Sequence, residues 1–263
     1  MIAPAKINLA LVVGPLRDDG KHELTTVYQA LELADEVDVE PADETTVEGF
    51  DDTIVRDALA LLGGSWRVRI EKRIPVAAGL GGGSSDAASA LRLANSRLAA
   101  PLPDDRLHEL AARVGADVPF FLRDGPPQLG TGDGTVLEPL DLPLDYAVLL
   151  FLPDGESKRS TADVYAAFDE RGGAAGFAER AGALHSALSA IERPRDLTTL
   201  PPNDLASSLH TDRVRAEGAF RADVSGAGPA VYGLFDDVGD ADRARRALGH
   251  LGATWVTKPA WYG

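Results

Sequence analysis

A glycine-rich segment at residues 74–86 carries the strongest chemical pattern in the sequence. It reads IPVAAGLGGGSSD, so Gly81, Gly82 and Gly83 are followed directly by two serines. Glycine accepts positive φ angles and lets the backbone approach a ligand closely. A helical pattern begins at Ala87, so the loop runs into a helix N-terminus, whose free N–H groups and dipole attract anions. The segment therefore predicts a site for a polyphosphate.

Other phosphate or dinucleotide motifs fit this loop poorly. No Gly-Lys-Ser/Thr follows the glycines, and the sole Gly-Lys pair, Gly20-Lys21, is followed by His22. The glycine spacing does not fit a dinucleotide fingerprint either. A flexible loop or tight packing between a strand and a helix remains the alternative. Ser84 or Ser85 is expected to cap the helix, because serine is a favoured N-cap residue.

An aspartate and a lysine from distant parts of the chain complete the candidate chemistry. Asp117 lies between apolar residues and a proline in GADVPFF, which makes it a candidate general base. The alternative is that it caps the next helical turn. Lys6, one of five lysines, lies on an otherwise apolar strand pattern. It either pairs with Asp117 and contacts a phosphate, or lies solvated on an edge strand.

Two further glycine-rich segments follow. Residues 224–230 read VSGAGPA, and backbone N–H groups there could face the first loop across a cleft. The alternative is an ordinary connection between elements with left-handed glycines. Residues 130–134 read GTGDG, which is typical of a hairpin.

Hydrophobic periodicity predicts the elements that position these residues. Alternation over residues 6–12 places Lys6 and Asn8 on one face of a strand. Similar patterns predict strands at 37–40 and 68–71 and helices at 53–62, 87–99 and 107–114. After residue 145 they predict strands at 146–152, 231–235 and 254–257, and helices at 162–169, 175–191, after 203, and 240–251. We therefore predict an α+β fold with two domains, residues 1–145 and 146–263.

Composition excludes several classes of protein. The 263 residues are 44% hydrophobic and 25% charged, as in ordinary globular proteins. The chain has no cysteine, which excludes disulfide scaffolds and cysteine nucleophiles, and its five histidines lack the pairing of a zinc site, so no metal site is predicted. A net charge of -15 disfavours nucleic acid and anionic membranes as partners. With no long apolar run and no signal-peptide pattern, we expect a cytoplasmic protein, and nothing fixes its oligomeric state.

The ordered motifs resemble the GHMP kinase superfamily. They are PAKINL (4–9), DGKHEL (19–24), the loop at 74–88, GADVPFF (115–121) and SGAGP (225–229). The glycine loop is common to the superfamily. The first and fourth motifs, with Asn203-Asp204-Leu205, more narrowly resemble its members that phosphorylate 4-diphosphocytidyl-2-C-methyl-D-erythritol.

The resemblance implies a fold, a reaction and site residues. The N-terminal domain would be similar to domain 2 of ribosomal protein S5 and the C-terminal domain ferredoxin-like, with the active site between them. The enzyme would transfer the ATP γ-phosphoryl group to the acceptor's 2-hydroxyl in non-mevalonate isoprenoid synthesis, with Mg²⁺ carried by ATP. Asp117 would be the base and Lys6 its cationic partner. Asn8, His22, Thr161 and Tyr165 would bind the acceptor. The ATP loop would comprise Pro75, Val76, Ala77, Ala78, Gly79, Leu80, Gly81, Gly82, Gly83, Ser84 and Ser85.

The sequence departs from this family at two places. Lys21 stands where the family has a tyrosine that stacks on the cytosine, and only its methylene stem can lie against a ring. We therefore expect the cytosine to lie between Tyr165 and a weaker wall. Asp52 and Thr53 replace an Asn-Leu pair beside the adenine pocket, which leaves the purine contacts open.

Two other functions stay open on the sequence. The first is a GHMP-type kinase with a different alcohol or phosphate acceptor, which Lys21 motivates. The second is a nucleotide-binding protein without catalysis on the same scaffold, against which the presence of Lys6 and Asp117 beside an intact loop argues.

Overall fold

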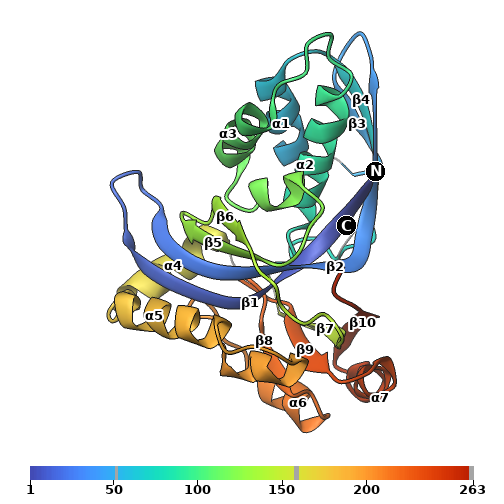
Figure 1. The fold of residues 1–263 in the computed structure, drawn as a ribbon. Helices are drawn as coiled ribbons and strands as arrows, with labels where there is room; N and C mark the ends of the chain where they lie inside the picture. The colour runs from blue at the N-terminus through green and yellow to red at the C-terminus, as the bar shows by residue number, and fades with distance from the viewer. Residues whose placement is uncertain (51–52, 157–159, 261–263) are drawn as a thin grey trace.

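The computed structural model describes residues 1–50, 53–156 and 160–260. Its strands form two β-sheets that helices cover (Figure 1). The six-stranded sheet has the order β3–β4–β2–β5–β6, and β1 pairs with the remaining edge of β2. Its members are β1 (Ile2–Leu16), β2 (His22–Pro41), β3 (Thr46–Glu48), β4 (Trp66–Glu71), β5 (Gln128–Gly132) and β6 (Val136–Pro139).

Strands β1 and β2 form one long antiparallel hairpin that carries much of the candidate site. The alternation predicted for residues 6–12 is confirmed, because Ile7 and Leu9 lie in the core while Lys6 and Asn8 line a cavity. The pairing register shifts just before Lys6 and again just after Asn8. Such bulges bend a strand and redirect its side chains, and here they bracket two candidate site residues.

Helices of the first half pack on the six-stranded sheet. Helix α2 (Gly82–Asn95) lies against β1 and β2 and contacts α1 (Thr53–Leu62) and α3 (Asp104–Val114). The predicted helix at 53–62 is confirmed, and α3 ends before Gly115 as the glycine there predicted. Helix α2 begins earlier than the predicted Ala87, because the glycines and serines form its first turn.

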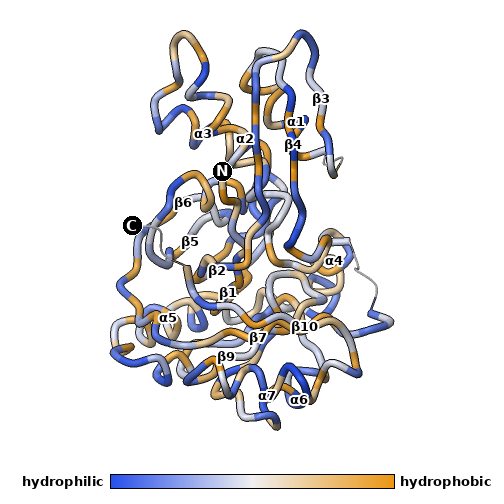
Figure 2. Tube along the Cα trace, turned by 90° about the vertical axis from the view of Figure 1, so that its right-hand side faces the viewer, coloured by the Kyte–Doolittle hydropathy of each residue, from blue (hydrophilic) through white to orange (hydrophobic). Residues whose placement is uncertain are grey.

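The four-stranded sheet has the antiparallel order β10–β7–β9–β8. Helices α6 and α7 pack on one face of it, and α4 and α5 lie nearer β1 (Figure 1). Figure 2 shows that α6 and α7 are largely hydrophilic toward the lower surface. The elements are β7 (Ala147–Pro153), α4 (Thr161–Glu170), α5 (Phe177–Leu188), α6 (His210–Ala216), β8 (Arg221–Val224), β9 (Val231–Phe235), α7 (Val238–Leu248) and β10 (Gly252–Thr257). Strand β8 was not predicted, and the other elements confirm the strands and helices predicted for this half.

One apolar cluster joins the two sheets. Ile7 and Leu9 from β1 pack with Val148 and Leu150 from β7. The division into domains at residue 145 stays a prediction, because this core is shared across it. Within the described ranges, no helix is long and apolar enough to cross a membrane.

Candidate active site

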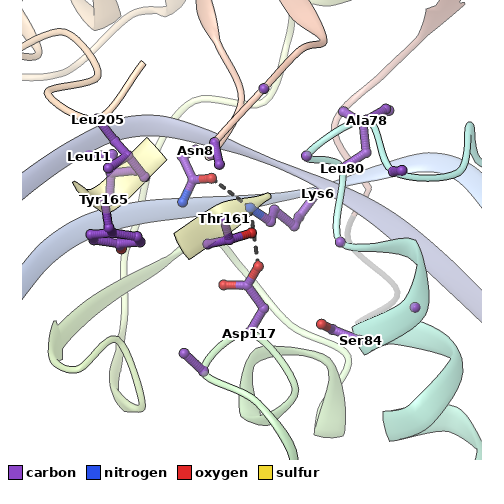
Figure 3. A pocket seen from close by; sticks show the side chains of 18 of the residues that line it. Lys6, Asn8, Leu11, Ala78, Leu80, Ser84, Asp117, Thr161, Tyr165 and Leu205 are labelled. Carbon is purple, nitrogen blue, oxygen red and sulfur yellow. Dashed lines mark hydrogen bonds and ion pairs between the residues drawn. The ribbon is translucent and has the colours of Figure 1, made fainter. Parts of the chain in front are cut away.

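The structure brings Lys6 and Asp117 together, although they are far apart in the sequence. The Lys6 Nζ atom lies 3.3 Å from Oδ2 of Asp117, and Figure 3 shows the two side chains pointing toward each other. Lys6 is only 3% exposed, so the solvated edge-strand alternative is wrong. The turn after Asp117 has Val118 as its N-cap and no side-chain cap, so the capping alternative is wrong as well.

A chain of hydrogen bonds fixes the Lys6 ammonium. Lys6 Nζ donates to Oδ1 of Asn8 at 2.6 Å, and Nδ2 of Asn8 donates to the Thr26 hydroxyl at 2.8 Å. That hydroxyl donates in turn to the Ala10 carbonyl at 2.8 Å. All of these side chains are buried, so the ammonium has one preferred position in the cavity.

Tyr28 is a third partner at this site. Its hydroxyl donates to Oδ1 of Asp117 at 3.1 Å. Burial, and next the negative charge of Asp117, raise the pKa of Tyr28 well above its ordinary value, so the phenol stays protonated. The sequence analysis missed it. Tyr28 lies on β2, directly opposite Asn8 of β1. The alternation of Thr26 with Tyr28 was the pattern in the sequence that could have indicated this position.

The glycine loop forms one wall of the cavity and ends at α2. Residues from Pro75 to Ser84 line the cavity, whereas the Ser85 hydroxyl is buried and has no hydrogen-bond partner among the described residues. The N-cap of α2 is Gly81 with φ 72°, so the prediction that Ser84 or Ser85 caps the helix is wrong. A left-handed N-cap suits glycine, and its carbonyl accepts the Ser85 N–H at 2.9 Å.

The second glycine turn packs directly on the first loop. The Ser225 hydroxyl donates to the Gly79 carbonyl at 2.9 Å, and the Ala230 N–H donates to the Ala78 carbonyl at 3.0 Å. Gly226 also lines the cavity, and a Cβ atom there would lie 3.3 Å from Lys6 Nζ. The turn therefore contacts the glycine loop directly rather than facing it across a cleft, and it is also the connection with left-handed glycines given as the alternative, since φ is 56° at Gly226 and 76° at Gly228. The hairpin predicted at residues 130–134 is confirmed by β5 and β6.

The predicted acceptor residues line another part of the same cavity. Thr161 and Tyr165 come from the first turns of α4, and the Tyr165 ring stacks on His22 at 4.8 Å with 23° between the planes. His22 Nδ1 lies 2.9 Å from the Gly14 carbonyl, and Nε2 lies 3.4 Å from Oδ2 of Asp169. Asp169, which the sequence analysis missed, lines the cavity too.

Lys21 forms an ion pair at the mouth of the cavity. Its Nζ lies 2.5 Å from Oδ2 of Asp133, and Oδ1 of the same carboxylate accepts hydrogen bonds from the backbone N–H and the hydroxyl of Thr135. Burial opposes ionisation of Asp133, but the bonds from Lys21 and Thr135 prevail and lower its pKa. The Lys21 ammonium is therefore tethered to the β5–β6 hairpin. Asp52, named beside the adenine pocket, lies outside the described residues, and Thr53 begins α1.

A buried charge cluster supports the glycine loop from behind. Lys72 Nζ donates to Asp35 at 2.5 Å and to Asp86 at 2.7 Å. Asp35 also accepts the backbone N–H groups of Arg73 and Ile74, which lead into the loop. Burial raises the pKa of Asp86 to about 7, against the opposing effect of Lys72. This cluster, also missed from the sequence, ties β2, the loop and α2 together.

The cavity between these walls is large. Its volume is about 1080 Å³, slightly above the ~300–1,000 Å³ of typical ligand sites. Among the described residues no group of three or more histidine, aspartate or glutamate side chains could hold a metal ion. The Ser84 hydroxyl lines the cavity at the N-terminus of α2, where a hard oxygen donor suits a cation already bound to phosphates.

Comparisons with known proteins identify the family of this chain. Family models of the GHMP kinases match residues 47–125 (N-terminal domain) and 212–254 (C-terminal). Curated relatives include the 4-diphosphocytidyl-2-C-methyl-D-erythritol kinases of Salinispora tropica, 36% identical over 94% of this chain and 87% of the relative, and of Chlorobium phaeobacteroides, 35% identical over 97% and 95%.

Solved structures show the same fold. A crystal structure of 4-(cytidine 5'-diphospho)-2C-methyl-D-erythritol kinase has a TM-score of 0.75 and 34% identity, covering 99% of both chains. Mevalonate kinase of L. major, at 15% identity and a TM-score of 0.73 over 100% of this chain and 96% of its own, shares the fold alone. This chain has the α+β fold of the GHMP kinases and belongs to the family of 4-diphosphocytidyl-2-C-methyl-D-erythritol kinases.

Proposed function

We propose that this chain transfers the γ-phosphoryl group of ATP to the 2-hydroxyl of 4-diphosphocytidyl-2-C-methyl-D-erythritol. The observation that carries the proposal is the ion pair of Lys6 and Asp117, 3.3 Å apart, in the same cavity as the glycine loop and the N-terminus of α2. A base beside an anion site is what phosphoryl transfer to an alcohol requires. Relatives named for this substrate match nearly the whole chain.

The chain's own residues take defined roles in the chemical step. As the acceptor oxygen bonds to the γ-phosphorus, its proton passes to Asp117, the bond to the β–γ bridging oxygen breaks, and ADP leaves. Lys6 pairs with the Asp117 carboxylate and stabilises the negative charge that develops on the acceptor oxygen. The loop amides and the helix dipole bind the triphosphate and hold the reactants in line.

Mg²⁺ is part of this proposal. When bound to ATP it neutralises phosphate charge, and the Ser84 hydroxyl at the start of α2 would hold it on the protein side. A single hydroxyl at the start of α2 suits a cation that arrives already bound to the nucleotide.

The acceptor is proposed to occupy the part of the cavity between β1, β2 and α4. Asn8 lies beside Lys6 and would contact the methylerythritol hydroxyls, with Thr161 close to α4's N-terminus. The cytosine would pack on Tyr165, with the stem of Lys21 as the second wall and His22 beside it. The protein's net charge of -15 repels anions, so the diphosphate of the acceptor must be held by local groups of the cavity.

The decisive experiment is an acceptor panel. The purified protein is incubated with Mg-ATP and 4-diphosphocytidyl-2-C-methyl-D-erythritol, mevalonate, homoserine or a set of sugars, and ADP and the phosphorylated product are measured. We expect turnover with the cytidylated acceptor alone. Turnover with another acceptor only would favour a different GHMP kinase, for which the Lys21–Asp133 pair is the motivating observation. Nucleotide binding without transfer to any acceptor would favour a non-catalytic protein.

A further inference from the structure

We infer that Tyr28 is a positioning residue for the catalytic carboxylate. Its buried hydroxyl donates to Oδ1 of Asp117 at 3.1 Å and thereby directs Oδ2 toward Lys6 and the acceptor hydroxyl. The inference rests on the proposed function, in which Asp117 takes the acceptor's proton.

The Tyr28 ring has no room to move. It is 1% exposed and stacks on Phe120 at 4.9 Å, with 27° between the planes. A Cβ atom at Gly130 would lie 2.7 Å from its Cε2 atom, and one at Gly134 would lie 2.9 Å from its hydroxyl oxygen. Glycine at both positions therefore makes the space that the ring fills, and the hydroxyl is fixed in place.

The Asp117 carboxylate needs such a partner. Its side chain is 32% exposed and lies in a short connection between α3 and the turn at Pro119–Leu122. The terminal torsion of an aspartate is broad and twofold, so an untethered carboxylate can present either oxygen. With Tyr28 on Oδ1 and Lys6 on Oδ2, the two oxygens have different partners and one orientation is selected.

The hydrogen bond also places a donor against the negative charge of the base. A donor to a carboxylate stabilises its charged form. The titratable groups that face Asp117 are Lys6 from β1, Tyr28 from β2 and Tyr165 from α4, and burial raises the pKa of both phenols above the ordinary value. Of these three, Tyr28 is the uncharged donor whose removal leaves the Lys6 ion pair in place.

The test is Tyr28→Phe, which removes the hydroxyl and keeps the ring. We expect kcat to fall roughly tenfold, less than the ~10²-fold loss expected without the base itself. The KM for ATP should change by less than about twofold, because the triphosphate loop is untouched, and the acidic limb of the kcat–pH profile should move to higher pH.

The matched control is Tyr146→Phe. Tyr146 is also buried, its hydroxyl lies 3.5 Å from Oε1 of Gln29, and it does not line the cavity. It should leave kcat and the pH profile unchanged. Thermal unfolding of both variants checks that a lower kcat does not reflect loss of the fold. A Tyr28→Phe enzyme with wild-type kcat and pH profile would overturn the inference.

A readout without acceptor separates this inference from the proposed function. If the wild-type protein phosphorylates no cytidylated acceptor, the proposed function fails. The Asp117 carboxyl carbon is then followed by ¹³C NMR in labelled wild-type and Tyr28→Phe proteins, with the resonance identified by its absence in Asp117→Asn. A higher titration midpoint in Tyr28→Phe supports the hydrogen bond's role, and equal midpoints overturn it.

Discussion

At the scale of single residues, the site depends on a lysine that water barely reaches. An unpaired buried ammonium is costly, and Lys6 avoids that cost through Asn8 and Asp117. The same pairing leaves Asp117 partly exposed to the cavity, where an acceptor can meet it. Within the pair, the Lys6 ammonium is thus buried and the Asp117 carboxylate is open to the cavity.

Asp117→Asn tests the base directly. We expect kcat to fall at least ~10²-fold, the lower bound for loss of a general base, because the amide cannot accept the acceptor's proton. The dissociation constant for ATP, measured by calorimetry, should change little, since Asp117 is not part of the glycine loop. Wild-type turnover in this variant would remove Asp117 from the mechanism.

Lys21 can be dissected by two substitutions. Lys21→Met keeps an apolar stem and loses the ion pair with Asp133, whereas Lys21→Ala loses both. If the stem is the second wall of the cytosine site, the acceptor KM should rise about fivefold in Lys21→Ala and much less in Lys21→Met, since a buried methylene contributes ~0.8 kcal/mol. Steady-state kinetics with varied acceptor gives both values. An equal rise in the two variants would assign the effect to the ammonium instead.

At the scale of elements, the two glycine segments form one interlocked unit. Gly79 has φ 83°, and a Cβ atom there would lie 2.3 Å from the Ser225 carbonyl oxygen. The close approach lets the Ser225 hydroxyl reach the Gly79 carbonyl, so loop and turn hold each other in shape.

Gly79→Ala should therefore damage ATP binding and stability together. We expect a loss of more than about 2 kcal/mol in the free energy of unfolding, from left-handed strain of ~1–2 kcal/mol plus the clash. The matched control is Gly63→Ala, where φ is 88° but no atom lies within 4 Å of the added Cβ, so the strain appears alone. Urea unfolding and ATP titration check both variants, and equal losses in the two would show that the contact with Ser225 is unimportant.

The sequence predicted these elements better than it predicted their contacts. Alternation around Lys6 and the glycine punctuation of the loop are local signals, and the strand and helix they indicate are both present. Tyr28, Asp169 and Lys72 were missed, because their role depends on which strands pair and which loop packs behind them. The serine N-cap failed for a local reason, since a left-handed glycine took that position.

At the scale of the whole molecule, a few buried polar groups join distant segments. Arg221 on β8 is 7% exposed and donates to the carbonyl of Leu9 on β1 at 2.7 Å and to those of Leu197 and Leu200 at 3.1 and 2.8 Å. The Lys72 cluster does the same for β2, the loop and α2. Stability therefore depends on the charge state of groups outside the catalytic pair.

The Asp86 carboxyl makes stability depend on pH. Burial raises its pKa from 3.8 to about 7 in the folded protein, so the folded state binds more protons than the unfolded state between those values. Its contribution to stability is present below about pH 4 and is lost as the pH rises through about 7. Asp86→Asn lacks this component.

Relative to wild type, Asp86→Asn should thus gain on the order of 4 kcal/mol between pH 4 and pH 8, since one pKa unit corresponds to ~1.4 kcal/mol. Urea unfolding of both proteins at several pH values measures the difference. A difference that stays constant with pH would show that Asp86 titrates as an ordinary carboxyl.

The bulges that bracket Lys6 and Asn8 impose a strict count on the first strand. Side chains of a strand alternate between faces, so adding or deleting one residue between these bulges would present Ile7 to the nucleotide and bury two polar groups among hydrocarbon. The tip of the hairpin at residues 17–21 lies beyond both bulges, so a change of length there would leave this spacing intact but would displace Lys21 from Asp133. The stretch that holds the amine must therefore keep its number of residues.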